Sequence, residues 1–295
     1  MTEALSARLV CSPYYFEKLL ALGLAPQDLD GLESIMHFPI TTREELLRHS
    51  DRIISFSGTD EHASTHKISS TGTSGLRLQV YRGLADERRT IALWEAAAGA
   101  KFPNELRVLF VCTLGQPKEY EASKSVESKN IRISRVAAGS LSGVDMSDYD
   151  ILTGTPDGLL AALATRSFRA RRRPPLLGYT TALPLAEDQA NRIAARLGCA
   201  HLHCYSMTEA GPIAWRCKHC QNTYHVYADM FVESVVGRVC VTKLSDSVFP
   251  LLRYLTDDYA EVHSEKMPCG FAGTSLRNLI GRKSMNFYLG SNAEA

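Results

Sequence analysis

Between residues 84 and 207 the sequence alternates between segments typical of helices and segments typical of strands. "LADERRTIALWEAAAG" (84–99) has the periodicity of an amphipathic helix, and the apolar run "LRVLFVCT" (106–113) is typical of a buried strand. "YDILTGTPDGLLAALATRSF" (149–168) gives strand, turn and helix, and "EDQANRIAARLGCAHLHCYSM" (187–207) gives helix and strand. This alternation predicts an α/β fold with a layered sheet.

Two regions of different character flank the alternation. Residues 14–52 show short helical periods broken by glycine and proline, and "TTREEL" has the capping-box pattern from Thr41 to Glu44. After Glu209, β-branched and aromatic residues separated by short polar turns predict a mixed or antiparallel sheet.

Composition narrows the class of partner. Lys and Arg number 33 and Asp and Glu number 32, so the formal charge of +1 points neither to nucleic acid nor to an anionic membrane. No apolar run approaches the roughly 18 residues that span a bilayer, and the N-terminus lacks the layout of a secretory signal. We therefore expect a cytoplasmic protein with a small-molecule partner. The dense basic run "FRARRRPP" is interpreted as a solvated turn after a helix.

The stretch "ISSTGTSGLRLQVYR" (68–82) contains a loop made only of Ser, Thr and Gly. Such residues let backbone N–H groups converge on an anion, which suits phosphate oxygens, although a flexible linker has the same composition. Strand-like segments on both sides indicate that the loop closes a hairpin. It matches no G-x-x-x-x-G-K-[ST] nucleotide fingerprint.

Three further motifs follow this loop in order: "CYSMTEAGP" (204–212), "PLLRYLTDDYAEV" (250–262) and "LIGRKSMNFYLG" (279–290). Together the four motifs resemble the core motifs of the adenylate-forming (acyl-CoA synthetase) superfamily, and within it the phenylacetate-CoA ligase branch. The resemblance implies the large N-terminal domain of an adenylate-forming enzyme: sheets layered with helices, plus a smaller strand-rich subdomain. It implies an N-terminal helical segment over 1–66 and an adenylate-forming core over 67–290.

The resemblance also implies a nucleotide site. Thr208 would touch the α-phosphate of ATP, Glu209 would ligate Mg²⁺, and Tyr205 would lie against adenine. Asp258 would bind the ribose hydroxyls with help from Arg282. The β- and γ-phosphates would lie on the phosphate loop, whose members are Ser70, Thr71, Gly72, Thr73, Ser74 and Gly75.

Each assignment has an ordinary structural alternative. Glu209 could be an acid at a helix N-terminus, Asp258 could cap a turn, and Arg282 could form a surface ion pair. The implied reaction joins a small, aromatic or similar carboxylic acid to AMP, with CoA, a carrier protein or an amine as possible acceptors. Family members often form dimers, so a homodimer is one expectation.

The sequence departs from the family pattern at several positions. Leu76 stands where a lysine follows the phosphate loop, Asp257 replaces a glycine, and Thr181 replaces another near the adenine motif. Ser284 and Met285 stand where hinge acids are expected, and the chain stops shortly afterwards. The resemblance therefore implies a core without the C-terminal lid domain. A non-adenylating acyltransferase, condensing partner or scaffold is the alternative function.

A second site is predicted by "RCKHCQNTYHV" (216–226), whose C-x₂-C-x₄-H spacing suits a tetrahedral zinc ion. We expect it to be structural and to tie the strand-rich part, at about 213–275, to the core. His219 is a rival ligand, and thiols merely packed in a turn are the alternative to a metal. The four expected ligands are Cys217, Cys220, His225 and Cys269.

The remaining cysteines are expected to be buried or surface thiols without a role. Cys204 raises one alternative, since a thiol beside an activated acyl group could receive it.

Overall fold

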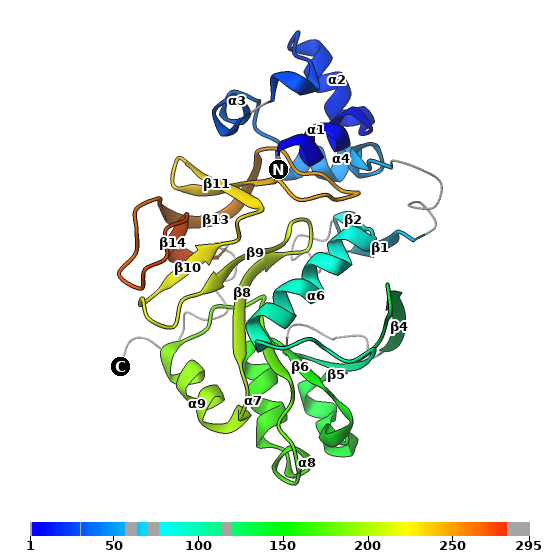
Figure 1. The fold of residues 1–295 in the computed structure, drawn as a ribbon, viewed down its shortest axis with the longest axis vertical. Coiled ribbons are helices and arrows are strands. Elements are labelled where there is room, and N and C mark those ends of the chain that lie inside the picture. The colour runs from blue at the N-terminus through cyan, green and yellow to red at the C-terminus, as the bar shows by residue number, and fades with distance from the viewer. Residues whose placement is uncertain (1, 30, 57–63, 70–76, 114–119, 282–295) are drawn as a thin grey trace. The chain divides into compact units, whose positions relative to one another are not determined.

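A computed structural model describes residues 2–29, 31–56, 64–69, 77–113 and 120–281 (Figure 1). The chain divides into two compact units: unit 1 comprises Met1–Glu87 and Ser206–Ala295, and unit 2 comprises Arg88–Tyr205. No helix in the described ranges is long and apolar enough to cross a bilayer.

Unit 2 is built on a mainly parallel sheet. β3 pairs in parallel with β5 and β6, β6 with β7, and β7 with β8, while β4 pairs with β5 in antiparallel orientation. The strands, in spatial order, are β4 (Tyr120–Val126), β5 (Lys129–Ala137), β3 (Glu105–Cys112), β6 (Ile151–Gly154), β7 (Leu177–Thr180) and β8 (His201–Met207).

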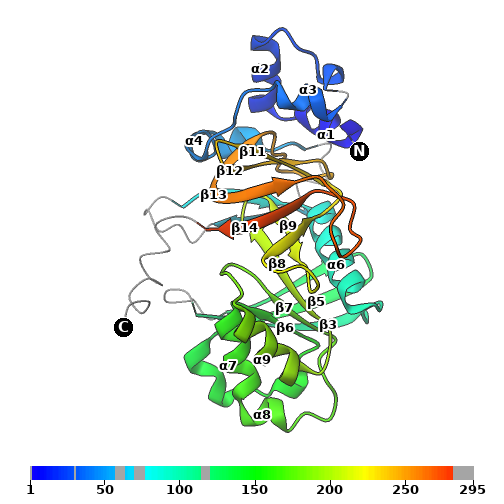
Figure 2. The same ribbon diagram turned by 90° about the vertical axis from the view of Figure 1, so that its left-hand side faces the viewer.

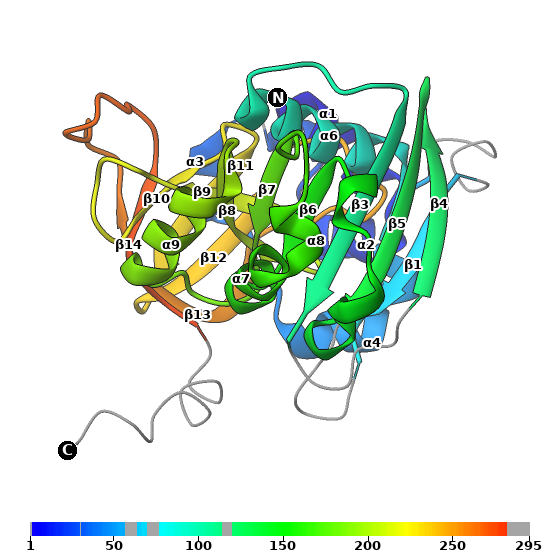
Figure 3. The same cartoon turned by 90° about the horizontal axis from the view of Figure 1, so that it is seen from below.

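Helices cover both faces of this sheet, α6 on one and α7 and α9 on the other (Figures 2 and 3). Two neighbouring residues of β7 contact helices on opposite faces of the sheet, because successive side chains of a strand point to opposite faces. A Cβ on Gly178 would lie 2.4 Å from a methyl carbon of Leu197 in α9, whereas Tyr179 packs against Trp94 of α6 with ring centroids 5.5 Å apart. The helices are α6 (Leu84–Ala98), α7 (Pro156–Ala164), α8 (Arg166–Arg169) and α9 (Glu187–Leu197).

The turn from β6 into α7 requires glycine because it approaches the backbone of β3. A Cβ at Gly154 would lie 1.9 Å from the carbonyl oxygen of Val111, and one at Gly158 would lie 2.4 Å from it. Thr155 caps the helix by accepting a hydrogen bond from the Gly158 N–H at 3.2 Å. This confirms the predicted order strand, turn, helix over 149–168.

Unit 1 begins with helices that pack on one another, α1 against α2 and α2 against α4. The capping box of α4 is formed by Thr42 and Glu45, so the prediction of Thr41 and Glu44 was wrong by one residue. Thr41 is used elsewhere, because its hydroxyl donates to the Leu252 carbonyl. The helical elements are α1 (Thr2–Val10), α2 (Pro13–Ala21), η1 (Pro26–Asp28), α3 (Leu32–Met36) and α4 (Arg43–Ile53).

The rest of unit 1 is strand-rich, and its described strands pair with one another in antiparallel orientation. β1 (His66–Ser69) and β2 (Gln79–Arg82) pair with Ser69 opposite Gln79, which confirms a hairpin around residues 70–76. The other strands, in spatial order, are β11 (Met230–Val235), β12 (Arg238–Lys243), β13 (Tyr254–His263), β14 (Ser275–Ile280), β10 (Thr223–Val226) and β9 (Gly211–Arg216).

Candidate nucleotide and metal sites

Glu209 lies in the turn at Thr208–Ala210 that precedes β9. It is not at a helix N-terminus, so that alternative for Glu209 does not apply. Its side chain is only 2% exposed. A carboxylate removed from water in this way needs hydrogen-bond donors or a counter-charge to remain ionised.

Two residues of unit 1 meet this requirement. The hydroxyl of Tyr254, at the start of β13, donates to Glu209 Oε1 at 2.7 Å. Nη1 of Arg43, at the start of α4, lies 3.8 Å from the same oxygen. Burial, and then the neighbouring Glu209 charge, raises the pKa of Tyr254, so its hydroxyl stays a donor. Three segments distant in sequence therefore converge on one buried carboxylate.

Arg82 also contacts the turn that contains Glu209. Its Nη2 donates to the Thr208 carbonyl at 3.2 Å, and a Cβ at Gly211 would lie 3.2 Å from its Nη1. Gly211 has φ +76°, a conformation that favours glycine, so both the backbone and the guanidinium require this residue. The main chain around Thr208 is thus braced by an arginine two residues before α6.

A buried charge network lies next to Arg82. Nζ of Lys243 is 2.9 Å from Asp86 Oδ1, and the Ser247 hydroxyl donates to the same oxygen at 2.8 Å. Burial raises the pKa of Asp86, but the Lys243 and Arg82 charges outweigh it, so the pKa is lowered overall. Asp86 is therefore ionised at neutral pH and electrostatically supports Arg82.

Asp258 lies within β13 and is 8% exposed. Its backbone N–H donates to the Thr256 hydroxyl within the same strand. A Cβ at Gly281 would lie 4.0 Å from Asp258 Oδ1, so the two motifs that were expected to share the ribose site are adjacent. Asp258 and Tyr254 lie on the same buried face of β13, four residues apart.

For the other residues that were predicted to bind the nucleotide, the structure describes fewer contacts. Tyr205 is partly buried on β8, and its carbonyl accepts a hydrogen bond from the Cys204 thiol. The phosphate-loop residues Ser70, Thr71, Gly72, Thr73, Ser74 and Gly75 lie outside the described residues, as does Arg282. Roles for these residues stay predictions.

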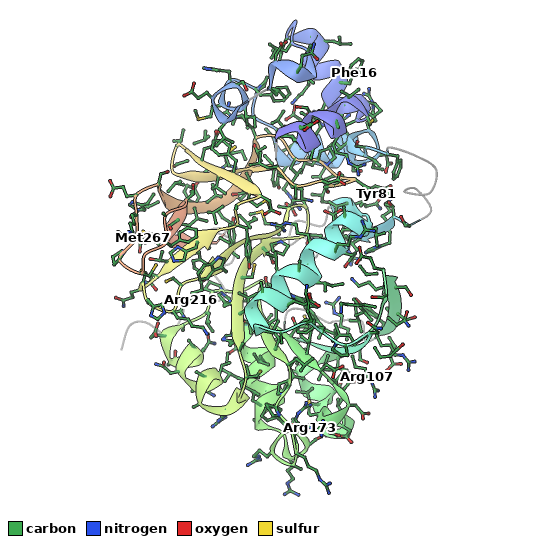
Figure 4. The ribbon with its side chains drawn as sticks, in the orientation of Figure 1. Phe16, Tyr81, Arg107, Arg173, Arg216 and Met267 are labelled. Atoms are coloured by element: carbon green, nitrogen blue, oxygen red, sulfur yellow. The ribbon has the colours of Figure 1, made fainter. Side chains whose placement is uncertain are left out.

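The predicted metal ligands Cys217, His225 and Cys269 come together in unit 1, with their ligand atoms within 4.8 Å of one another. Cys269 Sγ and His225 Nε2 are 3.2 Å apart. Arg216 and Met267, labelled in Figure 4, lie at the same edge of the unit. Cys217 directly follows β9, His225 lies in β10, and Cys269 lies in the loop before β14.

The surroundings of this cluster fit a zinc ion. The Ser275 hydroxyl lies 2.9 Å from His225 Nδ1, an arrangement that orients the ring and leaves Nε2 facing Cys269. Burial lowers the pKa of His225, which favours the neutral, metal-binding imidazole. The Phe271 N–H lowers the pKa of Cys269, whereas burial raises that of Cys217.

Cys220 is the predicted fourth ligand. It lies outside the group of three, although its thiol influences the pKa values of Cys217 and Cys269. The rival His219 is exposed, and its contribution is the backbone N–H that donates to Cys217 Sγ at 3.3 Å. The choice of Cys220 as fourth ligand therefore stays a prediction.

Reasoning from sequence missed Arg43, Tyr254 and Ser275. Tyr254 lies in the motif "PLLRYLTDDYAEV", and Arg43 follows the N-cap of α4, but neither position signals contact with Glu209. Burial raises the pKa of the Cys199 thiol to about 11 and that of the Cys240 thiol to about 12. That these cysteines have no role stays a prediction. Cys204 is 1% exposed, as expected of a packed thiol.

Comparison with solved structures identifies the fold. The chain superimposes on 2-hydroxyisobutyryl-CoA ligase in complex with 2-HIB-AMP and CoA, in an open conformation, with a TM-score of 0.64. That match has 13% identity and covers 95% of this chain and 68% of the ligase. The post-adenylation state with R3-HIB-AMP gives a TM-score of 0.65 at 15% identity, covering 96% and 67%. The chain has the fold of the adenylate-forming acyl-CoA ligases.

Sequence comparison gives a more specific relative. The chain is 26% identical over 302 residues to phenylacetate-coenzyme A ligase of Thermus thermophilus, a match that covers 92% of this chain. It spans 66% of the length of that protein. No family model matches the chain. The resemblance drawn from the motifs is thereby confirmed, since the sequence is similar to a phenylacetate-CoA ligase and the fold is that of the acyl-CoA ligases.

Proposed function

We propose that this chain binds ATP and activates a small carboxylic acid, aromatic or similar, as an acyl-adenylate. The observation that supports this most is the buried Glu209 carboxylate, held by Tyr254 and Arg43 in the turn of the motif "CYSMTEAGP". Burying a carboxylate that is only 2% exposed costs stability unless it is paired and hydrogen-bonded, so this placement marks Glu209 as a candidate binding residue.

The described residues fit distinct parts of the nucleotide. The Glu209 carboxylate is a hard oxygen donor of the kind Mg²⁺ prefers, and Mg²⁺ usually takes one or two carboxylates together with phosphate oxygens. When bound, the metal would neutralise phosphate charge. Thr208 offers a hydroxyl beside it to the α-phosphate. Asp258, next to Gly281, can accept hydrogen bonds from both ribose hydroxyls.

The reaction that these residues would support is a displacement at phosphorus. A carboxylate oxygen of the acid forms a bond to the α-phosphorus, the bond from that phosphorus to the bridging oxygen breaks, and pyrophosphate leaves. The protein's contribution is to hold the two negatively charged reactants together, which is positioning and electrostatic stabilisation. The acyl group would then pass to CoA, a carrier protein, an amine or another nucleophile.

The Cys217, Cys220, His225 and Cys269 group is proposed to hold a structural zinc ion. Closed sites with four protein ligands leave no open position for a substrate, so the ion would stabilise the fold and take no part in the reaction. It would connect β9 and β10 to the loop before β14.

The test is ATP–pyrophosphate exchange by purified, zinc-loaded protein across a panel of aromatic and aliphatic acids. We expect exchange with at least one acid, and its loss in Glu209→Gln. Asp257→Asn is the matched control, because Asp257 is an exposed acid that pairs with Arg238. If folded protein exchanges with no acid, adenylation is excluded and a non-adenylating acyltransferase, condensing partner or scaffold takes its place.

A further inference from the structure

The ion pair between Arg43 and Glu209 differs from the other buried ion pairs of unit 1. Lys243 Nζ lies 2.9 Å from Asp86, and Arg253 Nε lies 2.7 Å from Glu233, so both of those pairs are hydrogen-bonded. The gap of 3.8 Å between Arg43 and Glu209 is too long for a hydrogen bond. Arg43 and Glu209 therefore attract each other by charge without being locked together.

The guanidinium of Arg43 also has unused donors. Its side chain is 12% exposed, and neither Nη1 nor Nη2 finds a hydrogen-bond partner within the described part of the chain. Buried arginines in structural pairs are usually bidentate, because unsatisfied buried donors cost free energy. As a purely structural contact, this arrangement would therefore lower the stability of the folded protein.

The backbone that carries Arg43 is, in contrast, firmly fixed. Thr42 and Glu45 close the capping box, and Thr41 forms a bridge with Tyr254, with its N–H donating to the Arg253 carbonyl at 2.8 Å. The Leu255 N–H donates back to the Thr41 carbonyl at 2.9 Å. The base of the side chain is thus anchored to the strand that supplies Tyr254, whereas its guanidinium interacts with Tyr254 and Glu209 by charge, without a described hydrogen bond from Nη1 or Nη2.

We propose that Arg43 is the counter-ion of Glu209 in the metal-free protein. Its positive charge stabilises the carboxylate until a divalent cation binds Glu209 and replaces the guanidinium as the neutralising charge. The inference rests on the proposed role of Glu209 as a Mg²⁺ ligand. A bound Mg²⁺ and the guanidinium compete for one buried negative charge and repel each other. The N-terminal helical segment therefore sets the metal affinity of the site through Arg43, a positioning residue.

Direct binding of Mn²⁺, a spin-detectable substitute for Mg²⁺, tests this in the zinc-loaded full chain at pH 8 without nucleotide. Arg43→Met removes the competing charge, so we expect the Glu209-dependent Mn²⁺ dissociation constant to fall roughly tenfold. Arg43→Lys should behave like the unsubstituted protein. Arg52→Met is the matched control, since Arg52 lies on the same helix and pairs with the exposed Glu17. Glu209→Gln defines the signal, because it should abolish binding at this site.

Equal or weaker Mn²⁺ binding by folded Arg43→Met would overturn the proposal, as would equally tight binding by Arg43→Lys and Arg43→Met. Should Arg43→Met not fold, Arg43→Gln carries the same expectation. Tightened binding in a protein that fails to exchange pyrophosphate would support the proposal and refute adenylation. Absence of Mn²⁺ binding in both the unsubstituted protein and Arg43→Met would refute the proposal for Arg43, while adenylation is judged separately by pyrophosphate exchange.

Discussion

Replacing Tyr254 by phenylalanine isolates the hydrogen bond that holds Glu209. Phenylalanine fills the volume of the tyrosine ring, so the change removes the hydroxyl at 2.7 Å from Glu209 Oε1 and leaves the packing of a 1% exposed residue intact. A hydrogen bond to a charged group contributes about 1.5–3 kcal/mol. We expect the free energy of unfolding to fall by roughly that amount and the melting temperature to fall by about 3–12 °C.

Tyr81→Phe is a matched control for this prediction. The Tyr81 hydroxyl also donates to a carboxylate, that of Asp51 at 2.6 Å, but the Asp51 side chain is 72% exposed (Figure 4 labels Tyr81). Water can replace that hydrogen bond, so we expect a loss below about 0.5 kcal/mol. Urea titrations and thermal melts followed by circular dichroism measure both variants. Equal destabilisation of the two would refute the reasoning that burial makes the Glu209 contact strong.

Two further predictions concern the metal cluster and the buried charge network. Purified protein should contain about one zinc ion per chain by elemental analysis; His225→Gln and Cys269→Ser should lose it, Cys199→Ser should keep it, and full occupancy in Cys269→Ser would remove Cys269 from the ligand set. Because the pKa of Asp86 is lowered in the folded protein, its ionised form stabilises the fold above its unfolded pKa of about 3.9, and this stability is lost as pH falls through the folded value. In Asp86→Asn the urea midpoint should therefore depend less on pH below about pH 4 than in the unsubstituted protein. If the two midpoints change equally with pH there, another group is responsible.

The fold was predictable where apolar periodicity was strong. α6, α7, α9 and β3 form where their patterns indicate, and buried apolar residues of α7 and α9 share one core cluster with β3. β4 was not predicted, since its sequence "YEASKSV" has no apolar alternation and the strand is exposed along most of its length. Edge strands of this kind depend on pairing with a neighbour, here β5, and leave little signal in the local sequence.

The candidate site was predictable to the extent that its residues belong to contiguous motifs. Glu209 and Asp258 stand out in their motifs, and the cysteine spacing indicates part of the metal cluster. The contacts that determine the chemistry of these groups come from distant segments: Arg43 is 166 positions before Glu209, and Ser275 is 50 positions after His225. Only the fold brings such pairs together, so a sequence pattern names the carboxylate or imidazole without naming its partner.

The departure at Asp257 illustrates the opposite case, in which the structure explains an unexpected residue. Asp257 and Asp258 are consecutive in β13, so their side chains point to opposite faces, and only Asp258 is buried. Asp257 instead accepts a hydrogen bond from Arg238 Nη2 of the neighbouring strand at 2.9 Å. The added carboxylate is therefore neutralised on the exposed face and does not enter the face that carries Tyr254 and Asp258. The residue that replaces the glycine therefore lies on the face of β13 opposite to the proposed ribose ligand, Asp258.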